Sequence, residues 1–258
     1  MVYKNGPRYK VRDVKDIKAD ILKARDINGD HVRTLFLPAG NTIAMKTDDL
    51  CDILKFANET FSILERITVY GSSRYIHKKG PQGLKLLAEA GLSRIHVGLE
   101  SGDNIILKRI KKGTSSKEQI EAGRWVIEAG IELSLYVVLG IGGKDRTEAH
   151  ARETAKVLNK IVPDFIRLRT FVPKINTPLL TEVQNGSFQM LSPHEVFQEV
   201  ALLIKELQAT SYLTSDHYTN YINLQGKLPE EKKRLLDKIN IALKQDEVLF
   251  RSFFIGTE

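Results

Sequence analysis

Five segments of this chain have the pattern of an apolar strand that runs into a polar or glycine-bearing loop. They are residues 35–41, 67–74, 94–102, 133–143 and 165–173. Helical patterns separate them with few residues between, and this alternation is typical of parallel strands with helices packed outside them. Functional loops of a parallel β/α barrel lie at the carboxyl ends of its strands. We therefore expect an α/β protein, a partial (β/α) barrel whose five loops build one site.

The helices between the strands carry their own stop signals. Residues 79–90 and 116–129 have apolar side chains at helical spacing. Each is followed by a glycine, Gly91 or Gly130, and then at once by an apolar strand. The two segments therefore indicate repeated β/α units.

The alternation ends after residue 173. Long helices are expected at residues 192–209 and 228–243, whereas residues 211–227 are polar and aromatic without a clear period. We expect a partial barrel over residues 1–191, and over residues 192–258 a helical extension that packs on it.

Composition narrows the class of protein. The chain has 258 residues, of which 42% are hydrophobic and 28% charged, a balance typical of a globular protein with a full-sized core. No apolar run reaches the roughly 18 residues that span a bilayer, and the first residues lack the apolar core of a secretory signal. A cytoplasmic protein without a membrane partner is expected.

Charge and cysteine content restrict the partners and metal sites. The net charge is +7, and the densest basic patch is residues 108–112 followed by Lys117. No aromatic residue is interspersed there as a base-stacking platform. Nucleic-acid binding and a solvated helix end both remain open. The single cysteine, Cys51, excludes an internal disulfide and a multi-thiolate metal site, so we expect no metal ligands in this chain and a small packed thiol on a helix.

Two strand ends contain the residues that are best suited to contact a ligand. Glu100 follows an apolar strand and is followed by Ser101 and Gly102, so its carboxylate could accept hydrogen bonds from a ligand or form a structural ion pair. The second strand end contains Gly140, Gly142 and Gly143. It offers a surface almost free of side chains, or it is only a tight turn. Its spacing does not match the dinucleotide-binding fingerprint.

Together these motifs resemble the radical S-adenosylmethionine (radical SAM) superfamily over nearly the whole chain. The likeness is closest to a subgroup with a Gly-Leu-Glu-Ser-Gly strand end, a Lys-Gly pair, a Gly-x-Gly-Gly turn, a His-Ala-x-x-Thr-Ala helix and a late His-x-x-Asn. Here these are residues 98–102, 112–113, 140–143, 150–155 and 217–220.

The resemblance implies a set of cofactor contacts. Gly40 and Asn41 stand where the superfamily holds the methionyl amine, although Asn41 replaces an acid. Glu100 and Ser101 would face the ribose or the carboxylate. The adenine would be supported by Gly140, Gly142 and Gly143 and lined on its other side by Val172 and its neighbours. Arg167 and Arg169 alternate on one strand and share a face; Arg169 is assigned to the cofactor and Arg167 to the substrate.

The late motif and its surroundings suggest where an unknown, small-molecule substrate would bind. His217 and Asn220 lie in a polar aromatic loop after the last barrel helix, and such a loop can close over a barrel mouth. Surface packing without a function is the other interpretation.

One departure from the superfamily is severe. Its members bind a 4Fe-4S cluster through a Cys-x3-Cys-x2-Cys loop, and this chain has no such triplet. Residues 1–4, Met-Val-Tyr-Lys, resemble a stretch that follows the third cysteine. We therefore expect a chain truncated at its N-terminus just after the cluster loop, with the first strand also missing.

The resemblance also implies an activity for a full-length form that carries the cluster. That form would generate a 5'-deoxyadenosyl radical from SAM and abstract hydrogen from its substrate, using an electron donor such as flavodoxin or ferredoxin. Whether this chain is itself an enzyme stays open. The alternatives are a cluster-less SAM- or nucleotide-binding barrel without catalysis, and an ordinary barrel lyase or aldolase.

Overall fold

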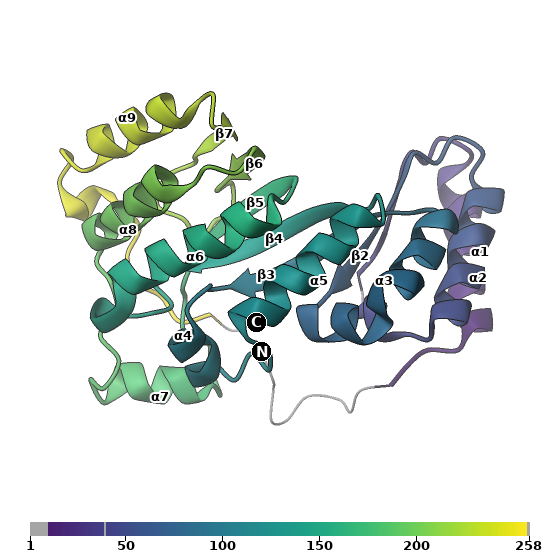
Figure 1. Cartoon of the computed structure of the whole chain (residues 1–258), viewed down its shortest axis with the longest axis horizontal. Coiled ribbons are helices and arrows are strands. Elements are labelled where there is room, and N and C mark those ends of the chain that lie inside the picture. Colours follow the sequence, from purple (N-terminus) through teal and green to yellow (C-terminus); the bar gives the residue numbers. More distant parts are fainter. Residues whose placement is uncertain (1–9, 39, 257–258) are drawn as a thin grey trace. The chain divides into compact units, whose positions relative to one another are not determined.

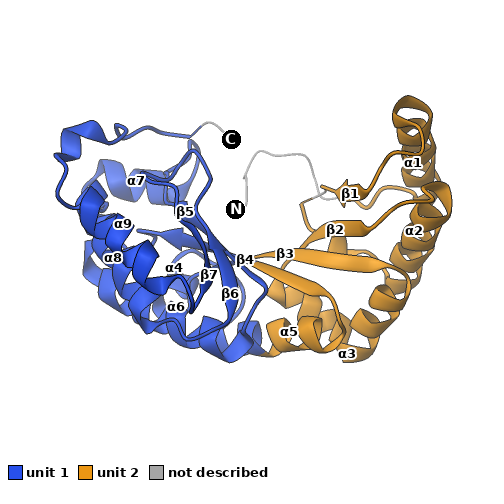
Figure 2. Ribbon diagram, turned by 90° about the horizontal axis from the view of Figure 1, so that it is seen from above, with its two compact units in different colours: residues 1–6, 99–120, 135–258 blue, residues 7–98, 121–134 orange. Residues whose placement is uncertain are grey.

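The computed structural model describes residues 10–38 and 40–256. They form two compact units, which Figure 2 shows in different colours. Of the described residues, unit 2 contains 10–38, 40–98 and 121–134, and unit 1 contains 99–120 and 135–256.

Within the described part of the chain, seven strands form one sheet and follow one another in chain order. Their bounds are β1 Thr34–Leu37, β2 Arg66–Gly71, β3 Leu92–Glu100, β4 Glu132–Leu139, β5 Phe165–Thr170, β6 Ser211–Thr214 and β7 Gln225–Leu228. The pairs β1/β2, β2/β3 and β5/β6 are parallel, and β6/β7 is antiparallel. This mostly parallel sheet with helices between its strands confirms the predicted α/β fold, a partial β/α barrel.

Three helices of unit 2 pack in chain order, α1 Val14–Asn28 on α2 Thr47–Thr60 and α2 on α3 Ser73–Glu89 (Figure 1). Helix α2 turns one apolar stripe inward, which contains Leu50, Ile53, Leu54 and Ala57. A short 3-10 helix, η1 Thr42–Ala44, follows β1. Helix α3 begins six residues before its predicted start, because Gly80 (φ 68°) and Pro81 break the helical period and only the second half is recognisable from the sequence.

Unit 1 contains most of the remaining helices. They are α4 Asn104–Arg109, α6 Thr147–Ile161, α7 Pro178–Gln184, α8 Pro193–Glu206 and α9 Lys232–Ala242, with the 3-10 helices η2 Lys144–Arg146 and η3 Glu247–Leu249. Helix α5 Ser116–Glu128 belongs partly to each unit. Helix α8 packs on α6 and on α9, and a capping box between Ser192 and Glu195 fixes its start.

Helix α8 also covers one face of the sheet. Val196 and Val200 of α8 line a small internal void together with Leu139 of β4 and Leu168 of β5. Alternate residues of β5 are buried on this side, whereas Phe165, Arg167 and Arg169 are only half-buried. The side chains of Arg167 and Arg169 on β5 therefore point away from α8.

The region after residue 191 differs from its predicted form in one respect. Its helices are present, but residues 211–228 also supply β6 and β7, which extend the sheet. Each of these strands has only four residues, and Tyr212 and Thr214 alternate with Ser211 and Leu213 without a clear apolar period. A division of the chain at residue 191 stays a prediction.

Candidate functional site

Glu100, at the carboxyl end of β3, has an unusual backbone. Its φ is 64°, in the left-handed region that non-glycine residues rarely adopt. Its carboxylate accepts a hydrogen bond of 2.9 Å from Nζ of Lys112, and the two side chains are 26% and 18% exposed. The ion pair that the sequence left open is thus present, while part of the carboxylate still reaches solvent. A strained residue at a strand end is a recurrent feature of binding sites.

Ser101, the next residue, lies inside the protein. Its side chain is fully buried, and its hydroxyl accepts a 3.0 Å hydrogen bond from the backbone N–H of Asp103. The same hydroxyl lies 2.8 Å from Nδ1 of His150 on α6. The predicted contact of Ser101 with a cofactor stays a prediction; in this structure its hydroxyl holds the loop after β3 against α6.

The loop after β3 is anchored further by charge. Asp103, which is 3% exposed, caps α4 by accepting from the backbone N–H of Ile105. Its other carboxylate oxygen accepts two hydrogen bonds, of 2.9 and 2.6 Å, from the guanidinium of Arg146. Such a two-point contact restricts the loop more than a single bond does.

A buried carboxylate on α8 meets the same region. Glu199 is 3% exposed and accepts hydrogen bonds from the backbone N–H of Gly140 (2.7 Å) and the hydroxyl of Thr147 (2.6 Å). Nε2 of His150 lies 3.8 Å from Glu199 and has no hydrogen-bond partner among the described residues. Glu199 thus connects α8 to the turn after β4. Glu199 was not among the predicted site residues. Its carboxylate stands on the apolar stripe of a helix, and that position could have indicated a buried polar contact.

The glycine turn after β4 packs tightly within unit 1. A Cβ on Gly142 would lie 3.0 Å from Ile106, and one on Gly143 would lie 3.0 Å from the carbonyl oxygen of Gln189. Gly140 (φ 76°) has Leu191 as its nearest neighbour. Because these glycines have no side chains, the neighbouring segments can pack close to the turn. This packing agrees with the alternative of a tight turn. The adenine contact of the three glycines stays a prediction.

The face of β5 that points away from α8 carries two arginines. Arg167 and Arg169 share this face with Tyr136 of β4 and Thr214 of β6, and we call these four residues the arginine face. The guanidinium of Arg169 lies over the ring of Tyr136, 4.5 Å from its centre. Arg167 and Thr214 are register partners. Tyr136 and Thr214 were not predicted; the stacking of Arg169 and the register of β5 with β6 show them beside the arginines.

The loop after β6 contains both residues of the late motif. Asn220 donates hydrogen bonds of 2.9 and 3.0 Å to the carbonyl oxygens of Leu168 and Ser215, and its Oδ1 accepts from Thr170. It therefore fastens the loop to β5. Burial lowers the pKa of His217 below its ordinary value, and the nearby guanidinium of Arg169 lowers it further. His217 thus lies near the arginine face and favours its neutral form. Val172 lies two residues after the end of β5 and is half-buried.

The remaining predicted contacts belong to unit 2. Gly40 and Asn41 follow β1, and Asn41 Nδ2 donates a long, 3.4 Å hydrogen bond to the hydroxyl of Ser72. Its Oδ1 is buried without a partner in the described part of the chain. The role of both residues at the methionyl amine stays a prediction.

The cysteine does not fit an iron–sulfur site. Cys51 is the only cysteine of the chain, and it lies on α2 with its thiol 3.6 Å from the carbonyl oxygen of Leu86. Burial raises the pKa of this thiol, so it remains protonated at neutral pH. Within residues 10–38 and 40–256, no group of three or more histidine, cysteine, aspartate or glutamate side chains is placed to hold a metal ion. In the same part of the chain, no helix is long and apolar enough to cross a membrane.

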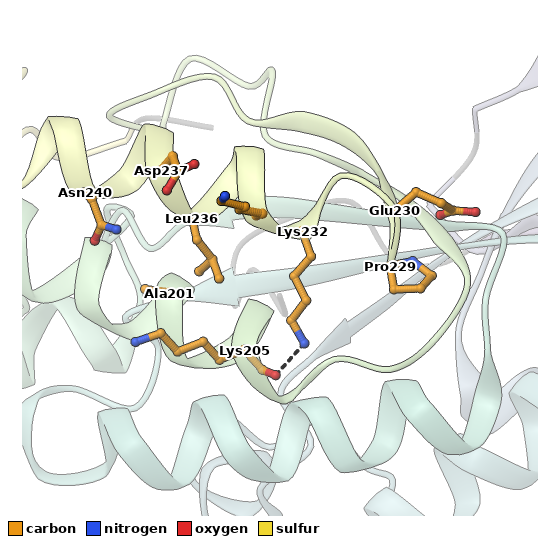
Figure 3. A pocket seen from close by; sticks show the side chains of 9 residues that line it. Ala201, Lys205, Pro229, Glu230, Lys232, Leu236, Asp237 and Asn240 are labelled. Atoms are coloured by element: carbon orange, nitrogen blue, oxygen red, sulfur yellow. Dashed lines mark hydrogen bonds between the residues drawn. The ribbon is translucent and has the colours of Figure 1, made fainter.

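A separate cavity of about 530 Å³ lies between α8 and α9 (Figure 3). Lys205 and Lys232 line it together with Glu230 and Asp237, so its charges are mixed. Nζ of Lys232 donates to the carbonyl oxygens of Lys205 and Leu207 and caps the end of α8. This arrangement indicates a structural role for Lys232.

The fold is that of a partial β/α barrel, with a mostly parallel sheet and helices between its strands. The sequence of residues 1–158 matches the family described as the Radical SAM superfamily. The chain therefore belongs to the radical SAM superfamily. A search of curated proteins finds no match.

Several solved structures share the fold at low sequence identity. An N-terminally deleted Elp3 from the archaeon Methanocaldococcus infernus is 15% identical, with a TM-score of 0.57 over 89% of this chain and 59% of Elp3. Methylornithine synthase (PylB) is 14% identical, with a TM-score of 0.55 over 95% of this chain and 77% of PylB. The Escherichia coli coproporphyrinogen III oxidase HemN, a radical SAM enzyme, is 15% identical, with a TM-score of 0.56 over 78% of this chain and 48% of HemN. The chain thus spans less than two thirds of Elp3 and of HemN.

Proposed function

We propose that this chain is the S-adenosylmethionine-binding part of a radical SAM enzyme, and that the strand ends of unit 1 bind the cofactor. The family match supports this assignment, because it covers β3, β4 and the loops after them. One observation carries it further. Glu100 keeps a left-handed backbone and a partly exposed carboxylate at the end of β3, where acceptors for the hydroxyls of a ribose are needed.

Arg169, which forms no ion pair within the described residues, fits the negative group of the same ligand. The methionyl part of S-adenosylmethionine carries a carboxylate, and Arg169 has an aromatic ring as its contact. Arginine stacked on a ring keeps the N–H groups at its edge free to donate. Glu100 and Arg169 are therefore our first-ranked cofactor contacts, and Ser101, Gly140, Gly142, Gly143 and Val172 are proposed to shape the loops around them.

The superfamily's hydrogen abstraction needs a 4Fe-4S cluster, which supplies the electron that cleaves S-adenosylmethionine. The residues of this chain do not fit that cluster, because it requires several thiolates and Cys51 is a lone, protonated thiol on α2. We therefore assign to this chain binding and orientation of the cofactor. Radical formation, with an electron donor such as flavodoxin or ferredoxin, is proposed only for a form that carries the cysteine triplet.

A second candidate function is favoured by the cysteine content itself. A barrel that binds S-adenosylmethionine or a related nucleoside without a cluster needs no thiolates. The two candidates share the binding step and differ in redox chemistry, so a binding measurement tests what they have in common.

Equilibrium dialysis of labelled S-adenosylmethionine against the purified chain tests the proposal. We expect Glu100→Gln to weaken binding by about tenfold, since hydrogen bonds to a charged acceptor are stronger than neutral ones. Glu59→Gln makes the same change on the exposed surface of α2 and is the matched control. If the unmodified chain does not bind, or both variants bind equally well, the proposal is wrong.

A further inference from the structure

The arginine face has the layout of a small charged site. Arg167 and Arg169 occupy alternate positions of β5 and point the same way, about 7 Å apart along the strand. Thr214 of β6 is the register partner of Arg167, so its side chain lies on the same face beside the guanidinium. Two cations and a hydroxyl donor thus converge from two neighbouring strands.

Two polar atoms of this face are buried without a partner. Nε of Arg167 and the hydroxyl of Thr214, a residue only 4% exposed, have no hydrogen-bond partner among the described residues. Buried polar groups are usually satisfied, and a buried donor left unpaired lowers stability. The two atoms on register-paired residues are thus unsatisfied within the described chain, and a molecule from outside the chain could supply their partner.

The charge of this face is also uncompensated. Neither Arg167 nor Arg169 forms an ion pair with a carboxylate in the described part of the chain. In the loop after β6, Arg169 and Lys174 lower the pKa of His217, and Asp216 opposes them. Glu100, the carboxylate at the end of β3, already accepts from Lys112. An anionic ligand would therefore find donors that no described carboxylate pairs with.

We propose that the arginine face binds the oxyanion group, a carboxylate or a phosphate, of an anionic substrate. Arg167 Nε and the Thr214 hydroxyl would donate to it, whereas Arg169, held flat on Tyr136, keeps the contact with the cofactor that we propose above. This inference rests on the proposed function, because it names the substrate class of the same unit. The proposal assigns Arg167 to the substrate and not to the cofactor, and it identifies only the charged group of that substrate.

Isothermal titration of the full chain with succinate and with inorganic phosphate, at constant ionic strength, tests the site. We expect at least one of them to bind. Arg167→Met should weaken that binding about tenfold or more, and Thr214→Val about fivefold. Lys205→Gln removes one positive charge in the cavity between α8 and α9 and should leave the affinity unchanged. The anion that binds more tightly identifies the group as carboxylate or phosphate.

Urea unfolding of the same variants tests whether Arg167 and Thr214 have a purely structural role. Because the two buried atoms have no partner in the free protein, Arg167→Met and Thr214→Val should leave the urea midpoint unchanged or raise it. A lower midpoint for both would show that their partners are internal and would overturn the proposal. So would the absence of binding to the unmodified chain, or equal losses in Lys205→Gln and Arg167→Met.

Competition with S-adenosylmethionine separates this inference from the proposed function. If the cofactor does not bind but the anion does, the proposed function fails and the oxyanion site stands. If the cofactor displaces the anion and Arg167→Met loses both ligands, the guanidinium holds the cofactor's own carboxylate and a substrate site there is wrong. Independent binding of the two ligands is the result we expect.

Discussion

The backbone N–H of Gly140 donates a 2.7 Å hydrogen bond to the carboxylate of Glu199, which lies 59 residues further along the chain. Both groups are buried. The turn after β4 is therefore held by α8, an element outside residues 1–158. The position of this loop thus depends on α8, and the sequence of the loop itself gives no sign of that contact.

Glu199→Ala should lower the free energy of unfolding by about 3 kcal/mol, because it leaves the Gly140 N–H and the Thr147 hydroxyl without their buried acceptor. Glu199→Gln should cost less, about 1 kcal/mol, since an amide can accept from Gly140 and donate to Thr147. Urea unfolding measures both. Glu206→Ala, which removes an exposed ion-pair partner of Arg152 from the same helix, should cost under about 1 kcal/mol; equal losses for Glu206→Ala and Glu199→Ala would contradict the account.

Gly102→Ala should destabilise unit 1 by about 2–3 kcal/mol. A Cβ at this position would lie 2.3 Å from the carbonyl oxygen of Glu153 and 2.7 Å from Cα of Thr154, so the loop after β3 or helix α6 must shift. At Gly40 a Cβ would meet no atom of the described residues within 4 Å, and Gly40→Ala should change stability by no more than about 0.5 kcal/mol. Thermal unfolding of the two variants compares them directly. Tolerance of alanine at residue 102 would show that the β3 loop is not packed on α6 as described.

Arg169→Gln should raise the pKa of His217 toward its ordinary value of about 6.5, without reaching it, because burial is the larger cause of the lowered value. A nuclear magnetic resonance titration of the histidine ring protons measures the change. Lys174→Gln should give a smaller rise, as Lys174 acts more weakly on the same ring. An unchanged pKa in Arg169→Gln would place His217 away from the arginine face.

The lowered pKa of His217 also predicts how the free energy of unfolding changes with pH. Since the pKa of His217 is lowered in the folded chain, the unfolded chain binds this proton more tightly. The contribution of neutral His217 is therefore fully present above about pH 6.5 and decreases as the pH falls from there through the lowered folded value. His217→Gln should make the unfolding free energy less dependent on pH in that window; an unaltered pH profile would refute this assignment.

Anaerobic treatment of the purified chain with iron and sulfide should not produce the brown absorbance of a 4Fe-4S cluster. The cluster needs several thiolate ligands, and Cys51 is the only cysteine. Cys51→Ser should give the same spectrum as the unmodified chain. One 4Fe-4S cluster per chain would show that other ligands replace the thiolates.

Much of the fold is predictable from the sequence, because strands such as Glu132–Leu139 have long apolar runs and clear glycine or proline stops. The strands β6 and β7 are too short for a period of their own, and they form because the edge of β5 offers them partners. The site is less predictable. Glu100 stands out locally, whereas the contacts of Thr214 and Glu199 join residues that are dozens of positions apart and follow only from the register and the packing of α8.

The most direct test of the central claim is a map of backbone amide shifts as S-adenosylmethionine is added to the chain. We expect the largest changes at the strand ends of unit 1, at Glu100, Arg169 and Val172, and we expect Glu100→Gln to reduce them. Changes confined to the cavity between α8 and α9, or no changes at all at saturating cofactor, would contradict it.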